Sequence, residues 1–304
     1  MNSERNFELI KAGYSKKKGR PYISMPSRKV EIFYTRQLLD ISKQCKAEGQ
    51  QILQLMIDSE RFVGDSFVGD APSFLARIAG IVKNGISAKV AAISGALASK
   101  VAKDQKEIVD DRLAKHIKIM SGVDTREIVR YGNAKRVIDE AIMVNVSYIE
   151  DIPKQYHSKL EKILMTAVQQ GKGTVWVGDE IEKLGKTTDN RAKLIAQDQV
   201  LSIGNKFNKN SQENLGINKY VWISREDRRV RGSPDCIYPQ HRGNNAKYSH
   251  YKRHDKIFKW VQTGGESDPG LVGGSYDEDG NNYPGDGHPG EPIRCRCEAF
   301  PYLE

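Results

Sequence analysis

Two cysteines near the C-terminus are the residues whose types and spacing best fit a chemical role. Cys295 and Cys297 lie two residues apart, so on an extended strand their thiols point to the same side. Thiols placed in this way bond each other poorly but can share a metal ion, and zinc is a common partner of thiolate and imidazole ligands. Further candidate ligands in the same part of the chain are Cys236, His250, His254 and His288.

The pattern predicts a zinc site made of Cys295, Cys297 and two of these other residues, with Cys236 and His288 as the first choice. Zinc is the only cofactor that the sequence suggests. The alternative is that both cysteines are small packing residues and that His288 makes a hydrogen bond within a loop.

A catalytic role for the same region is a second interpretation. His250 or His288 could act as a general base beside Asp227 or Glu291, as in a nuclease. The acidic and basic residues from Asp227 to Arg231 are more simply a charged turn in which Asp227 pairs with an arginine. The sequence contains no P-loop, GxSxG or HExxH motif. We therefore predict no catalytic residues and no enzymatic activity.

The distribution of charge suggests contact with nucleic acid. The 304 residues carry 48 Lys and Arg against 39 Asp and Glu, for a net charge of +9. Basic side chains neutralise phosphates and release counterions, so binding of this kind weakens with salt. The alternative is a solvated basic arm without a ligand. The candidate DNA contacts are Lys16, Lys17, Lys18, Arg20, Arg28 and Lys29.

Composition excludes other classes of protein. Four cysteines in 304 residues are too few for a disulfide framework, and Cys45 is expected to be packed on a helix. No stretch approaches the roughly 18 apolar residues of a membrane span. The Ala-rich segment 76–102 is the sole basis for a membrane-active alternative, and charged residues interrupt it. We expect no membrane partner.

The elements that position these residues follow from the apolar spacing. Residues 1–26 lack periodicity and predict a basic flexible arm. Residues 27–187 predict a helical region, with one helix opened by Pro153 and ending near Gly171. Residues 188–304 predict a loop-rich module that begins with a helix capped by Thr188 or Asp189. The expected class is α+β, mainly helical in the first two-thirds with a small C-terminal domain of short hairpins.

Two local patterns in the module are more specific. Gly216 predicts a helix C-cap followed by an apolar contact from Ile217. Residues 220–223 are apolar on both faces, as a covered strand would be.

A series of motifs in this half of the chain resembles a known family. In order they are residues 191–199, 215–217, 220–222, 227–231, 248–250, 258–260 and 286–297, preceded by segments 145–153 and 156–171. Together they cover residues 140–301 and resemble the phage Mu F-like minor head proteins, the phage head morphogenesis family. The motif residues, which the resemblance marks as structural, are Asp198, Trp222, Asp227, Arg229, Arg231, His250, Trp260, His288, Pro289, Gly290, Pro292, Cys295, Arg296 and Cys297.

The resemblance implies a structural role in a tailed bacteriophage or prophage. A member of this family is a minor component of the phage head that binds the portal protein, joins the procapsid and influences packaging or ejection of DNA. The expected partners are the portal protein, scaffold and capsid proteins and double-stranded DNA. The expected location is the head interior or portal vertex, and the host cytoplasm during assembly. The alternative function is a metal-dependent nuclease-like enzyme that uses the C-terminal His/Cys cluster.

Overall fold

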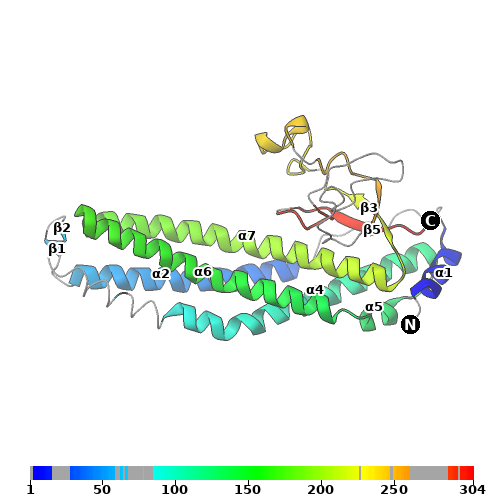
Figure 1. Cartoon of the computed structure of the whole chain (residues 1–304), viewed down its shortest axis with the longest axis horizontal. Helices are drawn as coiled ribbons and strands as arrows, with labels where there is room; N and C mark the ends of the chain where they lie inside the picture. Colours follow the sequence, from blue (N-terminus) through cyan, green and yellow to red (C-terminus); the bar gives the residue numbers. More distant parts are fainter. Residues whose placement is uncertain are drawn as a thin grey trace, which may run out of the picture. The chain divides into compact units, whose positions relative to one another are not determined.

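The computed structural model describes residues 3–15, 28–58, 62–63, 66–67, 78, 85–225, 227–246, 249–260, 287–293 and 295–304. The chain divides into two compact units. Residues 29–101 and 140–197 form one, here named the helical unit, and residues 1–28, 102–139 and 198–304 form the other, named the sheet unit. The helices α4 (Ile86–Ser121), α6 (Lys135–Gln170) and α7 (Thr174–Asn214) each contribute residues to both units (Figure 1).

The division differs from the predicted succession of arm, helical region and module. The predicted boundary between residues 187 and 188 falls inside α7, and the two units also divide within this helix, between residues 197 and 198. A helix built from apolar residues at three- and four-residue spacing gives no sequence signal at the point where it passes from one core to the next.

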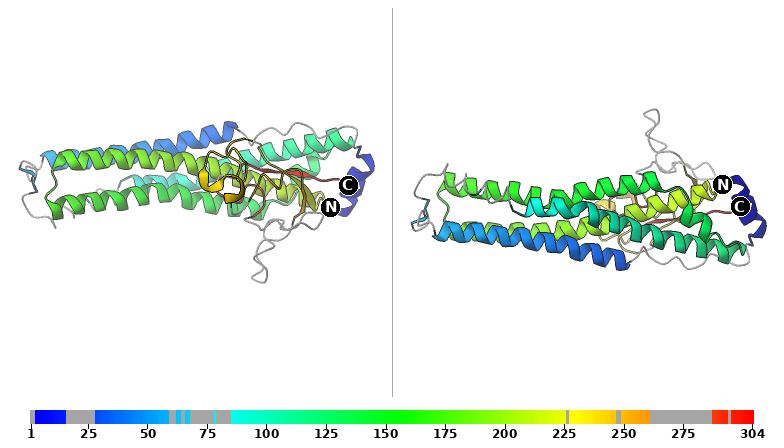
Figure 2. Two further views of the ribbon diagram at one scale, coloured as in Figure 1. Left: turned by 90° about the horizontal axis from the view of Figure 1, so that it is seen from above. Right: turned by 90° about the horizontal axis from the view of Figure 1, so that it is seen from below.

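In the helical unit, apolar stripes at helical spacing form the core. Helix α2 (Arg28–Asp58) buries Leu38, Ile41 and Cys45 on one face, so the predicted packing of Cys45 is confirmed. Helix α6 buries Tyr156 and Leu160 in the same way. Both views in Figure 2 show α2, α6 and α7 running alongside one another in this unit. Each fully buried side chain of this kind contributes about 1.5–3 kcal/mol.

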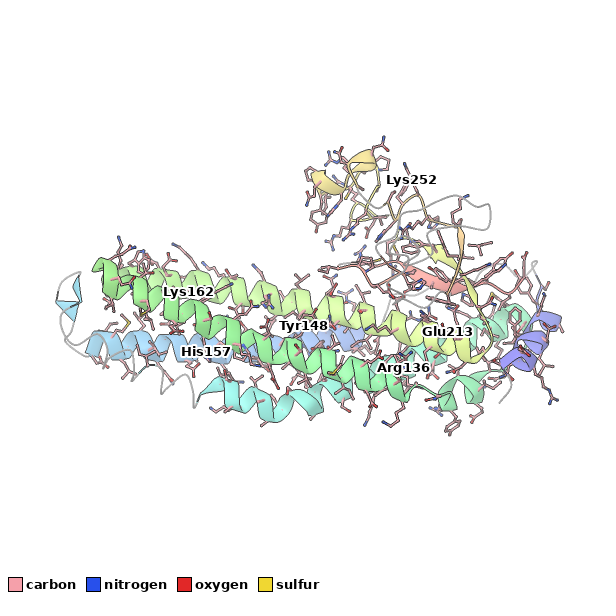
Figure 3. All side chains as sticks on the ribbon, viewed as in Figure 1. Arg136, Tyr148, His157, Lys162, Glu213 and Lys252 are labelled. Carbon is pink, nitrogen blue, oxygen red and sulfur yellow. The ribbon has the colours of Figure 1, made fainter. Side chains whose placement is uncertain are left out.

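Buried polar contacts fix the register of these helices. Glu48 of α2 and His157 of α6 approach to 2.5 Å, and the Glu48 carboxylate also accepts the N–H of Ile86 at the start of α4. His157, labelled in Figure 3, is 8% exposed. Between α2 and α7, Asp189 of α7 accepts hydrogen bonds from Ser42 and Lys46 of α2. Because buried polar groups need partners, each contact favours a single arrangement of these helices.

Two predicted helix starts are wrong. Pro153 lies inside α6, although proline removes one helical hydrogen bond. Ile149 and Tyr156, which flank it, are both buried on the packed face, and tertiary packing of this kind outweighs local propensity. Thr188 lies inside α7, where its hydroxyl donates to the carbonyl of Leu184 instead of capping a helix. The end of α6 at Gln170, followed by Gly171 with a φ of 63°, agrees with the prediction.

The sheet unit is built on a three-stranded antiparallel sheet. Strand β3 (Lys219–Ile223) lies between β4 (Ile257–Lys259) and β5 (Glu298–Pro301). Alternate residues of β3 point to opposite faces. Val221 packs with helices α1 (Ser3–Gly13), α4 and α5 (Arg126–Tyr131), whereas Tyr220 and Trp222 pack with the two cysteines on the other face. The covered strand expected at 220–223 is confirmed, as is the α+β class.

The N-terminal segment is more structured than predicted. Residues Ser3–Gly13 form helix α1, and Ile10 is completely buried in a core shared with α4, α5, β3 and β5. The prediction of a flexible arm over residues 1–26 is therefore wrong for this helix. Its short apolar stripe of Phe7 and Ile10, diluted by charged residues, gave too weak a periodic signal.

The C-terminal end of α7 connects helices to sheet. Gly216 has a φ of 79°, and the N–H of Ile217 donates to the carbonyl of Gln212, so the predicted glycine cap is confirmed. The side chains of Asn208 and Gln212 both donate to the carbonyl of Ala299 in β5. The last turns of α7 thus hold the edge strand that follows the two cysteines.

Shorter elements complete the described parts. Strands β1 (Phe62–Val63) and β2 (Ser66–Phe67) pair antiparallel within the helical unit. Two short 3-10 helices, η2 (Pro239–His241) and η3 (Gly243–Asn245), lie in the connection between β3 and β4. Within the described residues, no helix combines the length and apolar character needed to cross a lipid bilayer.

Candidate functional site

A buried group of one histidine and two cysteines is the candidate site. Cys295 and Cys297 immediately precede β5 and lie on the same face of the sheet as Ala299, which confirms that their side chains point the same way. His250 comes from the connection between β3 and β4. Its Nδ1 lies 3.5 Å from the sulfur of Cys295 and 3.7 Å from that of Cys297. The three side chains are at most 5% exposed.

The electrostatics of the group favour one thiolate. Burial raises the pKa of the Cys295 thiol, but the hydrogen bond with Cys297 and the charge of His250 outweigh it, so this pKa lies well below its usual value. The pKa of Cys297 is raised by burial and by the neighbouring Cys295. A thiolate beside an imidazole is the form of cysteine that binds metals.

A tight turn holds Cys295 in place. The N–H of Gly290 donates to the sulfur of Cys295 over 3.3 Å, and the N–H of Cys295 donates to the carbonyl of Pro292. The carboxylate of Glu291 accepts the N–H of His288 over 2.8 Å. Gly290 has a φ of 82°, a conformation that glycine adopts without strain. The motif residues of this segment thus shape the turn that carries the thiol.

The structure selects a different ligand set from the one expected. Within the described residues, the ligand atoms that gather within 4.8 Å belong to His250, Cys295 and Cys297. His288 instead hydrogen bonds through Nδ1 to the hydroxyl of Tyr220 at 3.0 Å. Cys236 is buried in the β3–β4 connection, outside this group. The two expected ligands Cys236 and His288 are therefore replaced by the single residue His250. The order of residues in the chain does not reveal which loop folds back over the cysteines.

The charged turn after β3 is also an internal contact. Asp227 forms an ion pair with Arg296, the residue between the two cysteines, and accepts the N–H of Arg229. Arg231 donates to the carbonyl of Ile293. The structure thus pairs Asp227 with an arginine, as the simpler interpretation of this turn expected. These contacts join the 227–231 turn to the 288–297 segment.

Aromatic rings surround the group. Trp222 of β3 packs edge-on against the ring of His250 with centroids 5.3 Å apart. Trp260 stacks near Tyr220 and His288, and its indole N–H donates to Gln212. Pro289 and Pro292 are buried in the turn, whereas Asp198 lies partly buried on α7. Trp222 and Trp260 therefore pack against the rings of His250 and His288, respectively.

A small cavity opens beside the group. It has a volume of about 80 Å³ and is lined by His250, both cysteines and His241. The pKa of His241 is lowered by partial burial and by the charge of Arg231. Four arginines also line the cavity, namely Arg225, Arg229, Arg231 and Arg296. A cavity with this lining favours anions over cations.

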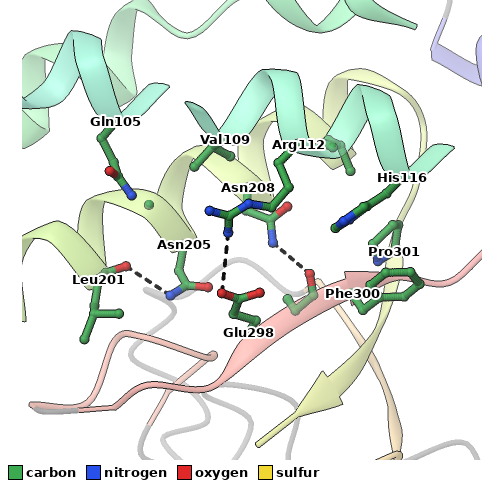
Figure 4. A pocket seen from close by; sticks show the side chains of 13 residues that line it. Gln105, Val109, Arg112, His116, Leu201, Asn205, Asn208, Glu298, Phe300 and Pro301 are labelled. Carbon is green, nitrogen blue, oxygen red and sulfur yellow. Dashed lines mark hydrogen bonds and ion pairs between the residues drawn. The ribbon is translucent and has the colours of Figure 1, made fainter. Parts of the chain in front are cut away.

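A second cavity, of about 40 Å³, lies between α4, α7 and β5 (Figure 4). Arg112 and Glu298 face each other there at 3.5 Å. Burial raises the pKa of Glu298 to about 7, against the opposing charge of Arg112. Burial, together with the charges of Arg112 and Lys115, lowers the pKa of His116 to about 4. The amide of Gln105, completely buried, points to this space without a hydrogen-bond partner among the described residues.

Sequence reasoning missed the second cavity. The sequence signal for this cavity is a helical stripe in which polar and apolar residues alternate: Gln105, Arg112 and His116 alternate with Val109 and Leu113. Such residues face a core and need buried partners.

The predicted DNA contacts are mostly untested by the structure. Lys16, Lys17, Lys18 and Arg20 lie outside the described residues. Arg28 and Lys29 are exposed at the start of α2, where they are accessible to a ligand.

Comparisons with known proteins give one relative of unknown role. The chain is 24% identical to an uncharacterized protein of Haemophilus influenzae over an alignment of 288 residues, and the match covers 91% of the chain. It spans 54% of that protein, so it corresponds to about half of the relative's length. No family model matches the chain, and no solved structure matches it.

Proposed function

We propose that this chain is a minor head protein of a tailed bacteriophage or prophage, of the Mu F-like kind. It docks at the portal vertex during procapsid assembly and contacts the DNA that is packaged or ejected. Its location is then the virion, and the host cytoplasm before assembly. The ordered series of motifs over residues 140–301 is the sequence basis for this proposal.

The observation that carries the proposal is the use made of the motif side chains. His288 hydrogen bonds to Tyr220, Asp227 pairs with Arg296, and Arg231 donates to the carbonyl of Ile293. Each of these contacts joins two parts of the sheet unit that are distant in the sequence. Polar side chains that hold loops in place favour a rigid assembly module over a catalytic site, because catalytic side chains must release and rebind protons.

The test is assembly in the presence of its partners. The full chain is co-expressed with the portal, scaffold and capsid proteins encoded beside it, and the procapsids are purified. We expect the chain in procapsids at a few copies, and its loss when the portal gene is left out of the co-expression. Procapsids that contain portal but never this chain would contradict the docking claim. Incorporation that is independent of portal would contradict the assigned position.

The alternative of a metal-dependent nuclease rests on one specific observation. His250 and the two cysteines line the same cavity as four arginines, and arginines beside a metal stabilise charge on a phosphate during its transfer. Supercoiled plasmid is incubated with the purified chain and Mg²⁺, Mn²⁺ or Zn²⁺. Nicking that disappears in His250→Ala and persists in His241→Ala would favour the enzyme over the head protein.

A further inference from the structure

We infer that His250, Cys295 and Cys297 bind one zinc ion whose fourth coordination position faces the arginine-lined cavity. The inference is independent of the proposed role in phage heads, because it uses only the geometry of the three side chains and the cavity beside them.

The distances between the ligand atoms fit a metal that is shared among them. In a tetrahedral zinc site with Zn–S near 2.3 Å and Zn–N near 2.0–2.1 Å, sulfur and nitrogen lie about 3.6 Å apart. The Nδ1 of His250 lies 3.5 Å and 3.7 Å from the two sulfurs. Both nitrogen-to-sulfur separations therefore match those of a tetrahedral zinc site.

The type of ligand selects the metal. Two thiolates and an imidazole are soft or borderline donors, which bind zinc in preference to magnesium or calcium. In addition, the N–H of Gly290 donates to the sulfur of Cys295, and such outer contacts orient a ligating atom and favour its charged form. A thiolate that is 5% exposed is costly to bury alone, and a bound cation offsets that cost.

The environment defines the fourth position. Within the described residues, no further cysteine, histidine or carboxylate joins the three ligands, so these residues supply three of the four tetrahedral positions. All three ligands line the cavity of about 80 Å³, which is large enough for a water molecule or a small anion. Arg225, Arg229 and Arg231 also line that cavity, so an anion on the zinc would lie beside positive charge.

The first experiment measures metal content. The full chain is purified without chelator from cells grown with added zinc, and metal is measured by mass spectrometry. We expect about one zinc per chain, and a loss of most of it in Cys295→Ser, Cys297→Ser and His250→Gln. Cys236→Ser and His288→Gln are the matched controls, because both residues are buried nearby and lie outside the group. These two variants should keep their zinc.

The second experiment does not depend on any variant folding well. The reduced wild-type chain is titrated with Co²⁺, and thiolate-to-cobalt charge-transfer and visible d–d bands are expected at one equivalent. Adding sodium azide should shift the d–d bands, because the fourth position is open.

Each outcome bears on one part of the inference. A wild-type chain without zinc and without cobalt bands after reduction would overturn the site. Equal loss of zinc in Cys236→Ser or His288→Gln would overturn this ligand set. Bands that azide leaves unchanged would overturn the open fourth position.

Discussion

Gly290 packs so closely against α7 that a Cβ at this position would lie 2.1 Å from Nδ2 of Asn205. The same glycine has a φ of 82° and donates its N–H to the sulfur of Cys295. One backbone position thus combines a left-handed turn, a close helix contact and the support of the candidate metal ligand.

Replacing this glycine should destabilise the sheet unit. Gly290→Ala suffers both the left-handed backbone and the clash with Asn205, and we expect it to lower the free energy of unfolding by about 2 kcal/mol or more. Gly243→Ala is the matched control, because Gly243 has a φ of 50° but open space where a methyl group would lie. Gly243→Ala therefore has the energetic cost of the left-handed backbone without a steric clash. Urea unfolding of the full chain measures both variants.

The double variant separates the two causes. Asn205→Ala removes the clashing amide, so Gly290→Ala should cost less in that background, with an interaction energy of about 0.5 kcal/mol or more. Because alanine keeps the Cβ of residue 205, which would lie 2.9 Å away, part of the steric cost remains in this background. Strictly additive effects would show that the amide of Asn205 contributes nothing to the cost of Gly290→Ala.

Glu298 should make the protein less stable as the pH rises. Burial raises its folded pKa from 4.5 to about 7, so the folded state holds the proton more tightly than the unfolded state. The stabilisation is complete below pH 4.5 and is lost as the pH rises through 7, by up to about 3 kcal/mol. We expect Glu298→Gln to lack this fall when unfolding is measured by denaturant across the pH range. A fall of the same size in the variant would assign it to another group.

His116 should have the opposite effect. Its folded pKa is lowered from 6.5 to about 4 by burial, so its stabilisation is complete above pH 6.5 and is lost as the pH falls through 4. In the wild type the two residues oppose each other between about pH 4.5 and 6.5. His116→Phe, which keeps a ring against Phe300, should show stability that falls with rising pH in this window. Glu298→Gln should show stability that rises, and slopes of the same sign in both variants would contradict the assignment.

These cases also show where the sequence is informative. Periodicity predicted the covered strand at 220–223 and the glycine cap at Gly216, because both depend on residues that are neighbours in the chain. The shared direction of Cys295 and Cys297 followed from strand geometry in the same way. His250 could not be chosen over His288 from sequence, since the choice depends on a long connection folding back over β5. Helix α1 was missed because Ile10 gains its burial from segments more than a hundred residues away.

The buried pair in the helical unit should respond to substitution as a unit. Glu48→Leu or His157→Leu leaves the partner buried without its contact, and each should cost about 3–5 kcal/mol. The double variant should cost clearly less than the sum, because neither Glu48 nor His157 is then left buried without the other. Glu182→Ala, which breaks the exposed pair with Lys186, is the control and should leave the stability nearly unchanged. Thermal unfolding and circular dichroism measure all four variants, and additive single costs would mean that the two side chains do not interact.

The basic residues before α2 should set the salt dependence of DNA binding. Deleting the N-terminus is a poor test, because α1 contributes Ile10 to the core. Substitution of Lys16, Lys17, Lys18 and Arg20 by alanine removes charge and leaves that helix intact. Each lost phosphate contact should flatten the plot of log affinity against log salt by about 0.9, as measured by fluorescence anisotropy with a labelled duplex. A variant with alanine at the exposed residues Lys159, Lys162, Lys172 and Lys186 has the same net charge. It should keep the wild-type slope, and equal flattening in both variants would show that overall charge, not this segment, attracts the DNA.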